Sequence, residues 1–291
     1  MRVKKQIAFF CLILAIGPLP AQELYVYSDP ASNVPARSLS VKYAGKALRT
    51  TDAFLHSHTM SRHMLESSIG IRKQWMVRPV LTISDMYTDR KQKFESFGIY
   101  SKFRFLSLDE VHKHFRAATF IKAVYSTNDL KYDELTGEGD QSAAQVGLIL
   151  TQLVGKLAVS TTVALNEVLD EERWLKYGGP RNFGYSSLNY SISAGYLLFP
   201  RSYTSYQQTN VNLYVELIGS RALDWKAYFV DFAPALQIIV CSNTKINIGY
   251  RFQLDWFSKA YRMSYLKQGS GVVSPSILFS VERTFLNTFR K

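Results

Sequence analysis

The residues best suited to chemistry in this chain are histidines and methionines that gather near its start. His56, His58, Met60, His63 and Met64 fall within nine residues and include three of the five histidines. Imidazole and thioether groups together suit copper or zinc-like ions, and a His-x-His pair on an extended segment puts both rings on one side. His56, His58 and His63 are therefore candidate ligands for an extracellular metal ion. The alternative is that they are ordinary solvated histidines of an outer loop, Arg49–His63.

A second set of residues could select ions by charge. If the apolar side chains of the patterned segments face lipid, their polar partners point into a lumen. This inward set is Lys42, Arg78, Lys102, Arg104, Arg116, Lys122, Lys245 and Arg251, against Glu216, Asp231 and Glu282. Rings of charge select ions by sign, so the cationic excess favours anions. In a narrow barrel the same residues can instead form a structural network of ion pairs.

Arrangements that would support an enzyme are not found in the sequence. No outward strand position pairs a histidine with a nearby serine. Glu66 and Asp85 are isolated, without a partner carboxylate for acid–base catalysis. There is no glycine-rich phosphate loop. We therefore expect no catalytic activity and no cofactor.

The segments that would position these residues alternate strictly between apolar and polar positions. In residues 244–255, Ile246, Ile248, Tyr250, Phe252 and Leu254 occupy every second position. Such a period of two places one set on each face of a strand, and this strand is longer than the usual five or six residues or so. Residues 156–167, 188–198 and 210–218 repeat the pattern. In lipid every backbone polar group must be satisfied internally, so spanning strands predict a closed barrel.

The composition agrees with an all-β membrane protein. The mature chain contains no run of about 18 apolar residues, which excludes a helical membrane protein. The aromatic content of 14% fits girdles at two membrane interfaces. The net charge of +12 would elsewhere suggest nucleic acid, but with a secretion signal we assign it to the lumen and to anionic lipid headgroups. The expected partners are outer-membrane lipid and lipopolysaccharide, with no nucleic acid.

The chain divides into three parts. Residues 1–21 have the cationic start and apolar run of a secretory signal peptide, which leaves Cys241 as the one cysteine of the mature chain and excludes an internal disulfide. Residues 22–37 form a periplasmic N-terminal segment that either plugs the barrel or stays outside it. Residues 38–291 form one outer-membrane barrel, and its oligomeric state is left open.

We predict about twelve antiparallel strands, with short periplasmic turns and longer extracellular loops. The last strand carries Phe285, with Phe289 near the terminus, which is the type of signal that barrel-insertion machinery recognises. The predicted strands are residues 39–47, 64–71, 75–85, 95–105, 115–125, 143–153, 156–167, 188–198, 210–218, 228–241, 245–254 and 275–285. The connections alternate between short and long, although two on the short side, residues 106–114 and 199–209, are longer than the other turns there.

Three groups of residues also carry a resemblance to a known family. They are residues 29–36, residues 193–200 together with 203–206, and residues 234–236 together with 249–252. With these the chain resembles an uncharacterised family of outer-membrane barrels from the Bacteroidota, some of them described as transporter-like. The resemblance covers most of the mature chain. It implies the fold and the outer membrane of a Gram-negative bacterium, and it implies no activity.

The leading functional hypothesis is a channel or transporter for small solutes or ions, leaning towards anions. The alternative is a non-conducting barrel that serves as a surface anchor or as a partner of a secretion or metal-handling complex. A pore requires inward residues small enough to open a lumen. Bulky inward side chains such as Tyr100, Phe120 and Tyr214 would instead close it.

Overall fold

The computed structural model describes most of the mature chain. It covers residues 25–51, 57–87, 89–111, 113–128, 139, 141–169, 186–200, 208–223, 228–254 and 275–289. The predicted signal peptide and His56 lie outside these ranges.

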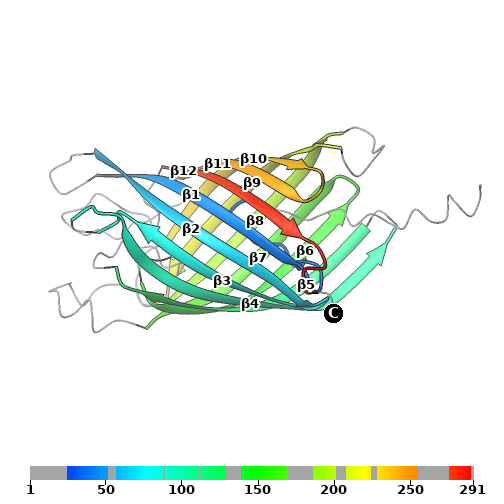
Figure 1. Cartoon of the computed structure of the whole chain (residues 1–291), viewed down its shortest axis with the longest axis horizontal. Coiled ribbons are helices and arrows are strands. Elements are labelled where there is room, and N and C mark those ends of the chain that lie inside the picture. The colour runs from blue at the N-terminus through cyan, green and yellow to red at the C-terminus, as the bar shows by residue number, and fades with distance from the viewer. Residues whose placement is uncertain are drawn as a thin grey trace, which may run out of the picture.

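Twelve strands form one closed barrel (Figure 1). Each strand pairs antiparallel with its neighbours in sequence, and β1 closes on β12 from Leu39 opposite Phe285 to Leu48 opposite Ser276. The strands are β1 Leu39–Thr51, β2 Ser57–Arg72, β3 Trp75–Ser84, β4 Lys93–Glu110, β5 Lys113–Ser126, β6 Ala143–Val154, β7 Leu157–Val168, β8 Ser186–Phe199, β9 Asn210–Ala222, β10 Tyr228–Val240, β11 Thr244–Gln253 and β12 Ser276–Phe285. The predicted fold is confirmed. Within the described ranges, no helix has the length and apolar character needed to cross a membrane.

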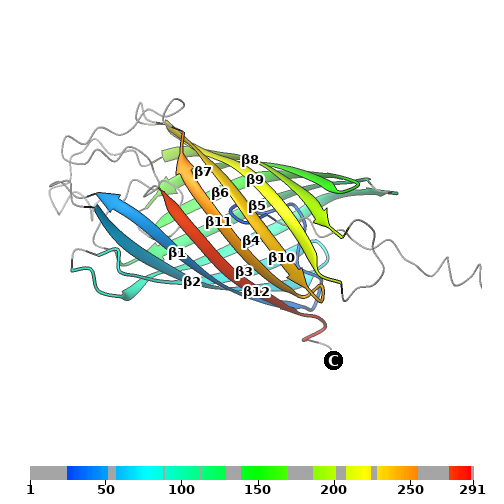
Figure 2. The same ribbon diagram turned by 90° about the horizontal axis from the view of Figure 1, so that it is seen from above.

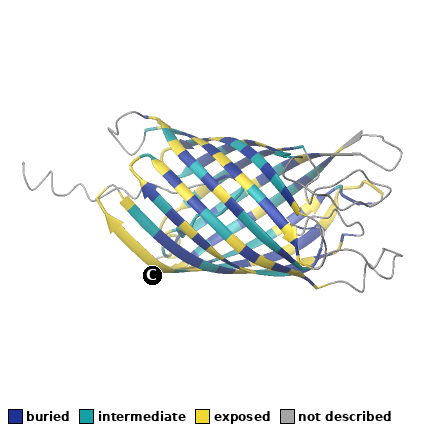
Figure 3. Cartoon of the chain, turned by 180° about the vertical axis from the view of Figure 1, so that it is seen from behind, coloured by how far each residue is buried: buried dark blue, intermediate teal, exposed yellow. Residues whose placement is uncertain are grey.

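Side-chain exposure alternates along the strands, as the sequence pattern predicted (Figure 3). On β7, Val159, Val163 and Leu165 are exposed on the outer face, whereas Ser160 and Ala164 are buried on the inner face. The same apolar outer face recurs on β4, β6, β9 and β11. Large apolar side chains would be costly in water over so wide an area, so this surface is suited to lipid.

Two predicted connections are wrong, because the strands continue past the apolar pattern. β2 begins at Ser57, and Thr51 pairs with Ser57, so the predicted loop Arg49–His63 is mostly strand. Likewise β4 runs to Glu110, which pairs with Lys113 across a tight turn, in place of the predicted turn at 106–114. Backbone hydrogen bonds continue to pair the strands beyond the segment whose side chains face the membrane. The apolar pattern therefore does not mark the ends of the strands.

The N-terminal segment, residues 25–38, lies inside the barrel, where Figure 2 shows it in dark blue among the strands. It leads directly into β1, at the end where β2 turns into β3: the Arg37 N–H donates to the Gly70 carbonyl at 2.6 Å. Pro35 approaches Gly70 so closely that a Cβ on Gly70 would overlap the Pro35 carbonyl. The sequence left open whether this segment lies inside the barrel or outside it, and in the structure it lies inside.

The assignment of faces makes a direct prediction for two adjacent residues of β7. Val163 is 45% exposed on the outer face, and its neighbour Thr162 lines the lumen. Val163→Arg should lower the free energy of unfolding in lipid vesicles by about 2–4 kcal/mol, because it places a charge near the bilayer midplane. Thr162→Arg places the same charge in a polar cavity and should cost much less. Equal losses in denaturant titrations of the two variants would contradict the assigned faces.

Candidate functional site in the barrel lumen

A carboxylate of the barrel wall binds the backbone at the start of the N-terminal segment. Glu216 on β9 is fully buried. It accepts hydrogen bonds from the N–H groups of Val26, Tyr27 and Ser28 at 2.9, 2.9 and 2.8 Å. The Ser28 hydroxyl also contacts that of Ser193 on β8 at 2.7 Å. Three consecutive N–H groups directed at one carboxylate form a strong, charge-assisted anchor.

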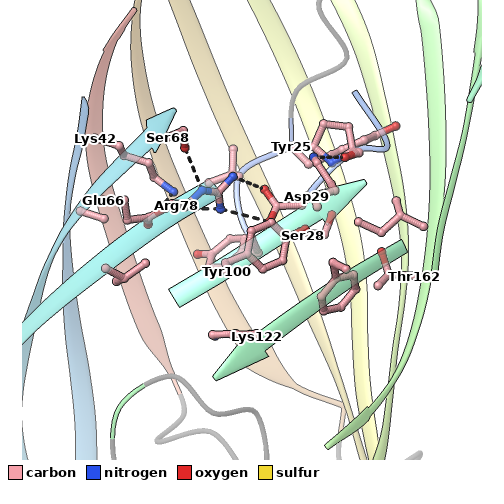
Figure 4. A pocket seen from close by; sticks show the side chains of 18 of the residues that line it. Tyr25, Ser28, Asp29, Lys42, Glu66, Ser68, Arg78, Tyr100, Lys122 and Thr162 are labelled. Carbon is pink, nitrogen blue, oxygen red and sulfur yellow. Dashed lines mark hydrogen bonds and ion pairs between the residues drawn. The ribbon is translucent and has the colours of Figure 1, made fainter. Parts of the chain in front are cut away.

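An ion pair in which the wall supplies the cation holds the next residue of the segment, Asp29. Arg78 on β3 donates from both terminal nitrogens to the two carboxylate oxygens of Asp29, at 3.1 and 2.9 Å. Figure 4 shows Asp29 facing Arg78, with Ser68, Glu66 and Lys42 on the other side of the guanidinium. This forked geometry is the arrangement in which arginine best recognises a carboxylate.

Two further cations hold the middle of the segment. Lys102 on β4 is almost fully buried and donates to the carbonyl oxygens of Pro30 and Ser32, both at 2.6 Å. Arg116 on β5 donates to the Ser32 hydroxyl at 2.7 Å. From β6, the Thr151 hydroxyl accepts the N–H of Ala31 at 2.9 Å. The segment is therefore bound by the wall at almost every residue from 26 to 32.

Glycines on adjacent strands accommodate two of the bulky inward aromatic rings, which also pack against the N-terminal segment: Phe120 in a cluster with Ala31, and Tyr214 against Tyr25. Phe120 lies over Gly147, where a Cβ would come within 2.6 Å of the ring. Tyr214 covers Gly195 in the same way and is 97% buried, with 3% exposed. Such cross-strand coverage of a glycine is a known way to stabilise sheets. These residues close less of the barrel than their size alone suggests.

A cavity of about 510 Å³ remains between the N-terminal segment and the wall. Its lining carries nine cationic side chains against three acidic ones. The cations are Lys42, Lys46, Arg78, Lys102, Arg104, Arg116, Lys122, Lys245 and Arg251, and the acids are Asp29, Glu66 and Glu282. Cationic side chains therefore outnumber acidic ones in this lining.

The structure brings the lumen candidates from the sequence to the inner side of the barrel, although several already have protein partners. Lys245 pairs with Glu282 at 3.0 Å, and Arg251 with the fully buried Asp231 at 2.8 Å. These two pairs join neighbouring strands and match the alternative in which charges form a structural network. The other cations surround the cavity and the N-terminal segment.

Sequence reasoning missed the functional partners that lie off the strands or outside the pattern. Asp29 was assigned to a segment of undetermined position, and Glu66 was regarded as isolated, whereas it lies 3.2 Å from Lys42 and 3.5 Å from Arg78. The signal for Glu66 was present: it falls in register opposite Lys42 once β1 and β2 are paired.

A second buried charge cluster lies towards the other end of the barrel. Arg62 on β2 and Glu95 on β4 are both fully buried and joined by two hydrogen bonds of 2.9 Å. Asn128, just beyond β5, donates to the same carboxylate at 2.8 Å. This cluster ties the connection after β5 to the inner wall.

Of the three proposed metal ligands, His63 alone has a side chain in the part of the chain that the structure describes, so the proposed metal site stays a prediction. His56 lies outside that part, and His58 belongs to β2. The ring of His63 stacks on Tyr43 and exchanges a 2.8 Å hydrogen bond with its hydroxyl. Among the described residues, no three histidine, cysteine or acidic side chains form a group that could hold a metal ion.

Comparison with known proteins identifies the fold and leaves the family open. No protein-family model matches the chain, and neither does any curated protein. Among solved structures, an outer membrane channel from Pseudomonas putida F1 matches with a TM-score of 0.53 and 10% identity, over 90% of this chain and 100% of that one. The NanC porin matches with a TM-score of 0.49 and 11% identity, over 85% and 98% of the two chains.

A third structure, the KdgM porin in complex with disordered oligogalacturonate, has a TM-score of 0.46 and 8% identity, over 84% of this chain and 99% of that one. At these identities the likeness concerns the fold. A closed antiparallel barrel with an apolar outer face belongs in the outer membrane of a Gram-negative bacterium.

Proposed function

We propose that the chain is an outer-membrane channel for small anionic solutes, narrowed by its own N-terminal segment. The observation that carries this proposal is the cavity beside the segment, with nine cationic side chains against three acidic ones in its lining. A ring of one charge sign concentrates ions of the opposite sign and repels the others. The resemblance to outer-membrane barrels of the Bacteroidota suggests that origin.

The form of the inner wall also supports conduction. A barrel that served only as an anchor would gain stability by filling its interior with side chains. Here the rings of Phe120 and Tyr214 lie over glycines, and a separate segment is held beside them through polar contacts and by packing of Tyr25 on Tyr214. Because this segment is not part of the wall, it can narrow the path without sealing it permanently.

The test is current through the refolded protein in planar bilayers, with reversal potentials measured in a potassium chloride gradient. We expect steady current with chloride favoured over potassium. Neutralising two cavity cations, with Arg104→Gln and Lys122→Gln together, should move the permeability ratio towards one because the lining loses charges that attract anions.

The matched control removes the same charge from outside the cavity. Lys113→Gln with Arg283→Gln changes two exposed residues that do not line the cavity, and selectivity should stay as in the wild type. If the cavity double variant and the exposed double variant change the permeability ratio equally, selectivity depends on the net charge of the protein and not on the lining of the lumen. Absence of current from a barrel shown to be folded by its heat-dependent gel mobility would contradict the channel.

The second candidate function is a non-conducting interaction barrel that anchors at the surface or joins a secretion or metal-handling complex. One observation favours it: the structure has contacts that restrict the lumen at two levels, the N-terminal segment and the cluster of Arg62, Glu95 and Asn128. In that case the connection after β5 is the first surface to test by capture of partners. For either function, insertion would use the barrel-insertion machinery, read from the final strand.

A further inference from the structure

Arg78 is held in a fixed orientation by the barrel wall. Its Nε donates to the Ser68 hydroxyl at 2.9 Å, and its guanidinium lies 5.0 Å from the centre of the Tyr100 ring. Glu66 stands 3.5 Å from NH1. With its stem and one edge fixed in this way, Arg78 presents two terminal nitrogens to the lumen as a preorganised fork.

The group that fills this fork is not part of the barrel wall. The carboxylate of Asp29 accepts both hydrogen bonds, and Asp29 belongs to the N-terminal segment inside the lumen. The side chains of both residues keep some exposure, 18% for Arg78 and 29% for Asp29, and both line the cavity. A solute in the cavity therefore has access to the edge of this pair.

The wall around the fork carries a cationic excess when Asp29 is left out of the count. Lys42 lies beside Glu66 at 3.2 Å, and Lys102 acts on Asp29 electrostatically while binding the carbonyl of the next residue, Pro30. Without Asp29, the wall has three cations here against Glu66, because Glu282, which also acts on Lys42, is paired with Lys245. An uncompensated cationic excess in a partly buried place is unfavourable, so an anion is needed there whichever molecule supplies it.

We propose that Arg78, with Lys42 and Lys102, forms a binding subsite for carboxylate-bearing solutes, and that Asp29 is an internal competitor occupying it. This inference rests on the proposed channel function and names its solute class. The Asp29 carboxylate stands in for the solute carboxylate. When a solute takes its place, the N-terminal segment loses the ion pair between Asp29 and Arg78, one of the charged contacts that hold it, so binding of the solute also favours opening of the path.

Succinate is the probe, and calorimetry of the refolded full-length protein measures its binding without any need for current. Asp29→Asn keeps the shape of the side chain but removes the competing charge, so the affinity for succinate should rise at least about tenfold. Adding Arg78→Gln to that variant should abolish the gain. Adding Lys113→Gln, an exposed residue at the start of β5 outside the cavity, removes the same charge and should leave the gain intact.

Channel recordings with the same variants separate the two proposals. Succinate should alter the chloride current of the Asp29→Asn variant at lower concentration than in the wild type, and uncharged 1,4-butanediol should not. A conducting protein with equal succinate affinity in the wild type and Asp29→Asn would overturn the subsite and leave the channel in place. Equal affinity for sulfate would overturn its assignment to carboxylates. Absence of current, together with the predicted calorimetric gain, would reject the channel alone.

Discussion

Glu216→Ala is expected to release the start of the N-terminal segment and to raise single-channel conductance towards that of a chain lacking residues 25–36. The wild-type carboxylate accepts three backbone N–H groups. Hydrogen bonds to charged groups contribute about 1.5–3 kcal/mol each. Even a partial loss of about 3 kcal/mol would shift the ratio of docked to released states by roughly 100-fold. Recordings should therefore show larger and noisier openings.

Ser193→Ala is the matched control for this prediction. It removes the 2.7 Å contact with the Ser28 hydroxyl and a 3.1 Å hydrogen bond to Glu216, but the three backbone bonds remain. Its effect on conductance should be small, because the contact with Ser28 is a neutral hydrogen bond that contributes only about 1 kcal/mol. The bond from Ser193 to Glu216 lies within the wall and does not hold the segment directly. If Glu216→Ala folds and conducts as the wild type does, then Glu216 does not hold the segment in place. If the chain lacking residues 25–36 also conducts as the wild type does, the narrowing assigned to the segment is wrong.

The strands could be predicted because residues that face lipid and residues that face the lumen alternate along each strand of a barrel wall. The alternation of Ile246, Ile248 and Tyr250 on β11 is repeated on neighbouring strands, and strands satisfy every backbone group in lipid only in a closed barrel. For the same reason Arg78, Lys102 and Arg116 could be assigned to the inner face. The strand ends could not be located, because the ladder continues after the apolar pattern stops.

The position of the N-terminal segment could not be predicted, because its contacts are distant in sequence and follow no period. Asp29 lies 49 positions from Arg78, and Val26 lies 190 positions from Glu216. The inward cations could be identified from the sequence. Whether each cation binds an ion, a solute or a carbonyl group of the chain depends on the three-dimensional path of residues 25–38. The alternation of apolar and polar residues therefore could not predict whether the lumen is open or narrowed.

The buried cluster at Glu95 is expected to be the most sensitive site for stability. Glu95→Ala leaves Arg62, which is fully buried, without the carboxylate that accepts its two 2.9 Å hydrogen bonds. Breaking a buried ion pair from one side costs about 3–5 kcal/mol. We expect a loss of that size in urea titrations of the refolded protein in lipid. Asn128 also loses its acceptor, so hydrogen exchange should accelerate at the described residues just beyond β5.

Two controls distinguish a buried charge from a general effect of mutating β4. Glu110→Ala changes an exposed residue at the other end of the same strand and should stay within about 0.5 kcal/mol of the wild type. The double variant Arg62→Met with Glu95→Leu replaces the pair by apolar groups of similar size and should recover most of the loss. A recovered stability together with faster exchange beyond β5 would show that the pair serves to hold this connection against the wall. A double variant as unstable as Glu95→Ala would instead mean that the packing of the glutamate stem, and not the ion pair, stabilises this end of the barrel.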